Sequence, residues 1–85
     1  MEHQDITVLL RSILTAAIGP LAVPDPIGDD TPLLGAIPEL DSMALVAILT
    51  DIQHRFGISV DDGEISAEVF ASFGSLRRFV AERST

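Results

Sequence analysis

Apolar residues recur with helical spacing near the start of the chain. Intervals of three and four residues place these side chains on one stripe of an amphipathic helix. The positions on the stripe are Ile6, Leu9, Leu10, Ile13, Leu14 and Ala17. Gly19 and Pro20 follow directly, and this pair ends the predicted helix.

The next stretch, residues 20–38, shows neither the period of a strand nor that of a helix. It is rich in proline, glycine and aspartate, the residues that favour turns. We predict a long ordered loop whose apolar side chains hold it against the core. These side chains are Leu21, Val23, Ile27, Leu33 and Leu34.

Helical spacing returns after residue 41 and predicts a second helix that ends at Gly57. Its core-facing positions are Leu45, Ile48, Leu49, Ile52 and Phe56. The sequence "ISVDDG" after it predicts a short extended turn that offers Ile58 and Val60 to the core.

Two serines predict the start of the remaining helices, because a serine hydroxyl can accept a hydrogen bond from a free backbone N–H. Ser66 would cap a brief helix that runs through Phe70, and Ser72 would cap a last helix. The apolar positions of that last helix are Phe73, Leu76, Phe79 and Val80.

These elements fit one small domain over residues 1–85. The predicted fold class is all-α: a small, mostly antiparallel four-helix bundle with a long first loop and a short third helix. No internal repeat or second domain is apparent.

Composition excludes several chemistries. The chain has no cysteine and no lysine, so it has no disulfide, no protein thiol nucleophile and no Schiff-base lysine. Thirteen acids against five arginines give a net charge of -8, which repels nucleic acid and favours a monomer.

No apolar run approaches the roughly 18 residues that span a bilayer, so we expect no membrane insertion. Arg11 inside the first apolar stretch does not fit a signal peptide, and a cytoplasmic protein is expected.

Two further candidate sites fail on spacing. The sequence "VDDGEIS" resembles part of a calcium loop, but Ile58, Val60 and Val69 fall where oxygen ligands are needed, so no metal site is predicted. Ser42 and His54 suggest a hydrolase, but about twelve residues of one helix, roughly 18 Å, separate them. No Gly-x-Ser-x-Gly motif surrounds the serine, and no catalytic residue is predicted.

The junction "LDSM" before the second helix is the remaining candidate. If Asp41 is the N-cap, Leu40 and Leu45 form a hydrophobic staple and Ser42 is the first helical residue. A phosphate on the Ser42 oxygen would meet the partial positive charge of the helix N-terminus. The residues alone leave two interpretations open, which are helix capping and attachment of a phosphodiester.

The sequence around this junction resembles the acyl carrier protein family from about residue 6 to residue 80. The family motif is an Asp-Ser-Leu-like triplet, an aliphatic series, a phenylalanine and a short Ile-x-Val segment. It stands here as "LDSMALVAILTDIQHRFGISV", preceded by "DTPLLG" and followed by "EISAEVFASFGSLRRFV".

This resemblance implies a carrier and not an enzyme. Ser42 would bear 4′-phosphopantetheine, transferred from coenzyme A by a phosphopantetheinyl transferase. Acyl-loading and acyl-transferring enzymes would then use the thiol of the arm to hold acyl groups as thioesters. By the same resemblance, Asp41, Met43 and Ala47 would take part in partner recognition.

The chain departs from the family on the exposed side of the second helix. Typical fatty-acid carriers are acidic there, whereas Asp51 is the only acid between Ser42 and Phe56. The face opposite the core stripe is predicted to hold Met43, Ala47, Thr50 and His54, with Ala44 at its side. We therefore expect a more apolar partner surface and a specialised pathway.

The motifs look most similar to those of stand-alone carriers encoded with exosortase and exopolysaccharide systems. Two alternatives stay open. An aminoacyl or peptidyl carrier would use the same arm, and a helical interaction module would have the fold without the arm.

Overall fold

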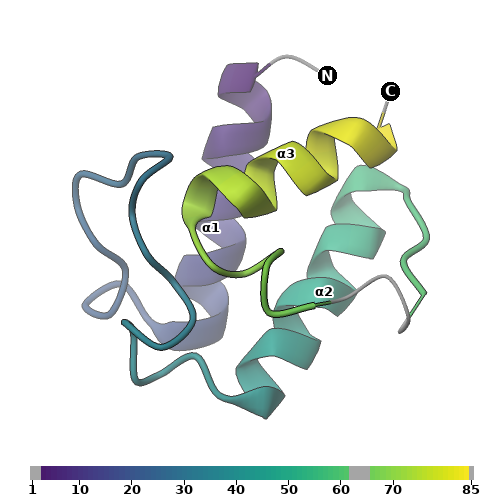
Figure 1. Cartoon of the computed structure of the whole chain (residues 1–85). Coiled ribbons are helices and arrows are strands. Elements are labelled where there is room, and N and C mark those ends of the chain that lie inside the picture. Colours follow the sequence, from purple (N-terminus) through teal and green to yellow (C-terminus); the bar gives the residue numbers. More distant parts are fainter. Residues whose placement is uncertain (1–2, 62–65, 85) are drawn as a thin grey trace.

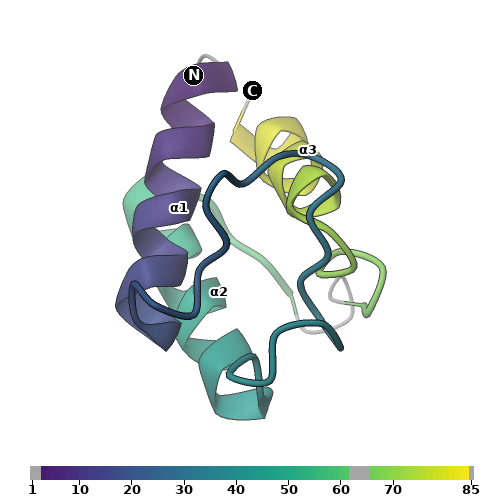
Figure 2. The same cartoon turned by 90° about the vertical axis from the view of Figure 1, so that its left-hand side faces the viewer.

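Three α-helices enclose the hydrophobic core in the part of the chain that the structure describes. The computed structural model describes residues 3–61 and 66–84. Its helices are α1 (His3–Ile18), α2 (Ser42–Phe56) and α3 (Phe73–Ser84) (Figure 1). α1 packs against both of the others, and α2 begins at the end of the molecule where α1 finishes (Figure 2). The predicted all-helical class is confirmed.

The expected count of four helices is not found in the described residues. The segment 66–70 makes successive turns instead of the predicted short helix, with Val69 N–H donating to the Ser66 carbonyl at 3.1 Å. Five residues are too few to offset the cost of starting a helix. The carbonyls of Phe70 and Ala71 instead accept hydrogen bonds from N–H groups of the long loop, those of Leu34 and Leu33, at 2.9 and 3.1 Å.

The core draws side chains from all three helices and from the long loop. Four positions of the predicted α1 stripe are buried, which confirms that stripe as the inner face of α1. The buried apolar residues are Ile6, Leu10, Ile13, Leu14, Val23, Leu33, Ile37, Leu40, Ala44, Ile48, Ile52, Phe70, Phe73, Leu76 and Val80.

The inner face of α2 is rotated from the predicted one. Ala44, Ile48 and Ile52 are buried at intervals of four residues, so Ala44 belongs to the core and not to the side of the helix. Leu45, which we expected to point into the core, is half-buried and packs at its margin. α2 packs against α1, and the residues of α2 that are fully buried in the core are Ile48 and Ile52.

The loop between α1 and α2 is ordered, as predicted, but one of the side chains that we expected to hold it against the core does not do so. Val23 and Leu33 are buried, whereas Leu21 is fully exposed. A turn closed by the Ala22 N–H and the Gly19 carbonyl at 3.2 Å puts Leu21 at its outer corner. The side chain therefore points away from the core.

The second half of this loop is fastened to the start of α3. The carbonyls of Asp29 and Thr31 accept hydrogen bonds from Gly74 and Phe73 at 3.0 and 2.9 Å. Asp29 also forms a two-point ion pair with Arg77, at 3.1 Å to Nε and 2.9 Å to Nη2. These contacts satisfy backbone N–H groups that the first turn of a helix leaves free.

The predicted cap of α3 is present. The Ser72 hydroxyl accepts a hydrogen bond from the Ser75 N–H at 3.1 Å, and the Ser75 hydroxyl accepts one from the Ser72 N–H at 3.1 Å. The two serines thus form a reciprocal cap. α3 is consequently held at its N-terminus by its own residues and by the loop.

Candidate functional site

The start of α2 is capped as the sequence predicts. Asp41 has an extended backbone, and its Oδ1 accepts a hydrogen bond from the Ala44 N–H at 2.8 Å. The Asp41 carbonyl accepts the first helical bond, from the Leu45 N–H at 3.0 Å. Ser42 is therefore the first residue of the helix, as expected.

The residues just before α2 are anchored in the core, whereas the residues at its start are exposed. Ile37 and Leu40, which lead into the cap, are buried in the core. Asp41, Ser42 and Met43 are exposed. The buried residues fix the direction of the chain, and the cap fixes the first turn, so the serine is held in place while its side chain faces solvent.

The Ser42 side chain is exposed to solvent. Within residues 3–61 and 66–84, no hydrogen bond engages its hydroxyl. It stands at the N-terminus of a helix of 15 residues, where the partial positive charge is concentrated. An exposed hydroxyl beside free backbone N–H groups fits a group joined through a phosphodiester.

Met43 and Ala47, the other predicted recognition residues, lie on the solvent side of α2. Met43 is 82% exposed, and Val46, which sequence reasoning missed, is 63% exposed. Val46 follows Met43 by three residues, so both side chains share one face of the helix. Val46 stands in an unbroken apolar series, and no local pattern distinguishes it from the core positions of the helix.

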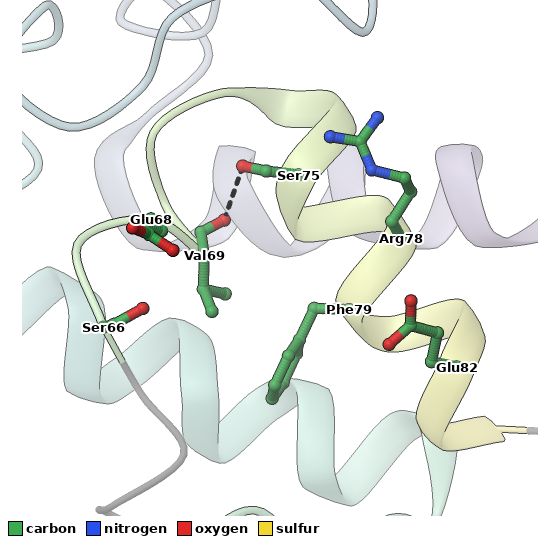
Figure 3. Close-up of a pocket in the computed structure, with 7 residues that line it drawn as sticks. All are labelled: Ser66, Glu68, Val69, Ser75, Arg78, Phe79 and Glu82. Atoms are coloured by element: carbon green, nitrogen blue, oxygen red, sulfur yellow. Dashed lines mark hydrogen bonds between the residues drawn. The ribbon is translucent and has the colours of Figure 1, made fainter.

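The structure contains a separate pocket of about 210 Å³ between the segment 66–69 and α3 (Figure 3). Val69 and Phe79 form its apolar wall, and the Ser75 hydroxyl donates a hydrogen bond to the Val69 carbonyl at 2.8 Å. Charged side chains, among them Arg78 and Glu82, surround the opening. No residue of α2 lines it, so this pocket is distinct from the exposed serine.

Other candidate chemistries find no support in the described residues. His54 is exposed in the last turn of α2, at the opposite end of that helix from Ser42. No group of three or more His, Asp or Glu side chains could hold a metal ion among the residues described. Most of the central part of the calcium-like sequence, including Gly63 and Ile65, lies outside them. None of the described helices is both long and apolar enough to cross a membrane.

A comparison with protein-family models settles the family. The model of the phosphopantetheine attachment site matches residues 8–82. The chain belongs to the phosphopantetheine-binding carrier family. Its cofactor is 4′-phosphopantetheine, and the carrier is not itself an enzyme.

A solved structure agrees with this family. The carrier is similar to a holo acyl carrier protein from Nitrosomonas europaea whose structure was determined by solution NMR. The two sequences are 40% identical over 93% of this chain and 94% of the other, with a TM-score of 0.80. A comparison with curated proteins gives no match.

Proposed function

We propose that Ser42 carries the 4′-phosphopantetheine arm and that the carrier holds acyl groups on it as thioesters. The observation that supports this most strongly is the exposed hydroxyl at the capped start of α2, in a chain of the phosphopantetheine-binding family. The arm, once attached, supplies a thiol that the cysteine-free chain lacks.

Attachment requires one bond to form and one to break. The Ser42 oxygen attacks the phosphorus of coenzyme A next to the pantetheine, and the bond to the nucleotide half breaks. The serine proton passes to a base of the transferase, and the nucleotide leaves. The product is a phosphodiester whose negative charge lies at the N-terminus of α2, where it is stabilised.

The neighbours of Ser42 prepare this step without taking part in it. Asp41 holds the first turn through its hydrogen bond to Ala44, so the serine keeps one position relative to the helix. Asp41 also offers the transferase a recognition point, and Met43 and Ala47 offer it uncharged side chains. A fixed attachment point with a flexible arm keeps the cargo at high local concentration near a docked enzyme.

Intact mass spectrometry tests this proposal. Incubation with coenzyme A and a broad-specificity phosphopantetheinyl transferase should add the mass of one phosphopantetheine to the wild type. Ser42→Ala should gain nothing and stay folded by circular dichroism, whereas the control Ser59→Ala, at another exposed serine, should be modified. An unmodified wild type would indicate a helical interaction module without the arm.

The pathway is the finer part of the proposal. We propose a specialised lipid or exopolysaccharide-related pathway, with the carrier acting as a cytoplasmic monomer of the type encoded with exosortase systems. The specialised pathway is supported by the absence of an acidic face on α2, where Asp51 is the only acid. The mass of protein purified from its native host would identify the cargo, and an aminoacyl cargo would instead indicate an aminoacyl or peptidyl carrier.

A further inference from the structure

The part of the loop that leads to Ser42 is bonded to the chain around the start of α3. Backbone hydrogen bonds of 2.9 to 3.1 Å join residues 29–34 to residues 70–74, and we call these two stretches the paired segments. Figure 2 shows the loop passing beside the start of α3 before it turns toward α2. The loop is therefore held by α3 on its way to the proposed attachment site.

The paired segments connect to Ser42 through a short series of hydrogen bonds. The Leu33 carbonyl accepts a bond from the Ile37 N–H, and the Ile37 carbonyl accepts one from the Leu40 N–H, both at 3.0 Å. All three side chains are buried. Asp41, the N-cap of α2, follows directly. The position of Ser42 therefore depends on where the paired segments hold Leu33.

Arg77 adds a side-chain contact between the paired segments and α3. Its Nε and Nη2 donate hydrogen bonds to the two carboxylate oxygens of Asp29 at 3.1 and 2.9 Å. Two parallel bonds fix the direction of the contact as well as its length. The Arg77 side chain is 12% exposed, so water competes less for this pair than for one at the open surface. The pair therefore fixes residue 29 relative to α3.

We propose that Arg77 is a positioning residue for arm attachment, because its pair with Asp29 sets the place of the loop that presents Ser42. This rests on the proposed function of Ser42. Without the pair, the paired segments gain freedom and the loop presents the serine in several positions. The transferase uses only the position in which the serine oxygen reaches the phosphorus of coenzyme A. Its apparent affinity for the carrier then falls with the fraction of molecules in that position.

A second arginine on the same loop provides a matched control. Arg11 pairs with Asp25 at 3.0 Å and ties the first half of the loop to α1. Asp25 precedes the paired segments, so this pair holds the loop without setting the place of Ser42. Arg77→Met and Arg11→Met each remove one guanidinium and keep an apolar stem of similar length. Urea denaturation defines the conditions in which both variants are fully folded.

The kinetics of arm attachment test the proposal, with the transferase of the mass experiment. Arg77→Met should raise KM for the carrier by about three- to tenfold with kcat unchanged, because the competent fraction falls while the chemical step stays the same. Arg11→Met should leave KM within about twofold of wild type. Arg77→Lys should recover part of the loss, since an ammonium keeps the charge but lacks the planar fork. An unchanged KM for Arg77→Met, a fall in kcat alone, or an equal rise in both methionine variants would overturn the inference.

Hydrogen exchange gives a readout that needs no transferase. The Ala44 N–H bonds to the cap beside Ser42, and it should exchange about three- to tenfold faster in Arg77→Met and at the wild-type rate in Arg11→Met. The N–H of Leu10, in the buried face of α1, reports global unfolding. An equal acceleration at Leu10 and Ala44 would reveal a merely structural role and contradict the inference, as would unchanged exchange at Ala44.

A second variant breaks the same pair from its other side. Asp29→Asn removes the charge that Arg77 pairs with and should reproduce the rise in KM and the faster exchange at Ala44, including where Arg77→Met does not fold. Wild-type behaviour of Asp29→Asn in both measurements would overturn the inference. A modified wild type with no effect of either variant would overturn only the role of Arg77, whereas an unmodified wild type would overturn the function of Ser42.

Discussion

At the scale of single residues, the Asp41 carboxylate determines where α2 begins. Its hydrogen bond to the Ala44 N–H satisfies one of the backbone groups that have no partner within the helix. Because this hydrogen bond joins residues 41 and 44, it also fixes the positions of Ser42 and Met43, which lie between them. Loss of this carboxylate would therefore loosen the turn that carries the proposed attachment site.

Asp41→Ala should lower the free energy of unfolding by about 0.5 to 2 kcal/mol, the range measured for lost N-caps. Asp41→Asn should recover most of this loss, because an amide oxygen can accept the same hydrogen bond. Chemical denaturation with urea measures both values. Asp30→Ala removes the same charge from an exposed loop position and should change the stability by less than about 0.5 kcal/mol. Equal losses for Asp41→Ala and Asp30→Ala would show that charge, and not capping, is responsible.

The residues that the sequence predicts best here are those whose roles depend on close neighbours in the chain. Asp41 and Ser72 were predicted as caps and Gly57 as a helix stop, because each acts within about four residues of its own position. Ser42 belongs to this group, since its exposure follows from its place just after a cap. Val46 was missed because its exposure depends on the rotation of α2 against α1, which no local pattern reports.

At the scale of elements, the loop between α1 and α2 depends on close contact with α3. Gly74 lies directly against the backbone of Asp29, and a Cβ added at Gly74 would come within 2.8 Å of the Asp29 carbonyl oxygen and Cβ. Only a residue without a side chain allows this approach. The contact brings Asp29 close enough for its ion pair with Arg77.

Gly74→Ala should lower the free energy of unfolding by about 1 to 3 kcal/mol, as expected for overpacking. This direction is opposite to the usual effect of replacing glycine with alanine inside a helix, which is a gain of up to about 1 kcal/mol. Thermal denaturation measures the change. Gly28→Ala is the control, since a Cβ there meets open space, and it should be neutral or slightly stabilising. A stabilised Gly74→Ala would mean that the loop moves away from α3 at little cost.

The element predictions were correct where an amphipathic period extended over several turns, as in α1 and α2. They were wrong where contacts between residues far apart in the sequence determine the local structure. The segment 66–70 forms turns because its end bonds to the loop at Leu33 and Leu34, residues far away in the sequence. Leu21 is exposed because a turn places it at a corner, although its hydrophobicity predicted burial.

At the scale of the whole molecule, negative charge opposes compactness. Thirteen acids face five arginines, and three of those arginines already pair with Asp25, Asp29 and Asp51 at 2.9 to 3.8 Å. The pairs with Asp25 and Asp51 are exposed and contribute little stability each, whereas Arg77 is only 12% exposed in its two-point pair with Asp29. The uncompensated acids repel one another more strongly in the compact state than in the expanded chain.

Salt should therefore stabilise the carrier, even though it weakens the ion pairs. Between about 0.02 and 0.3 M NaCl the Debye length falls to below about 8 Å, and repulsion between surface acids is screened. A gain of about 1 kcal/mol would raise the melting temperature by about 4 to 8 °C. The rise should level off once screening is complete, whereas a general salting-out effect would continue into the molar range. A falling melting temperature would show that the ion pairs outweigh the repulsion.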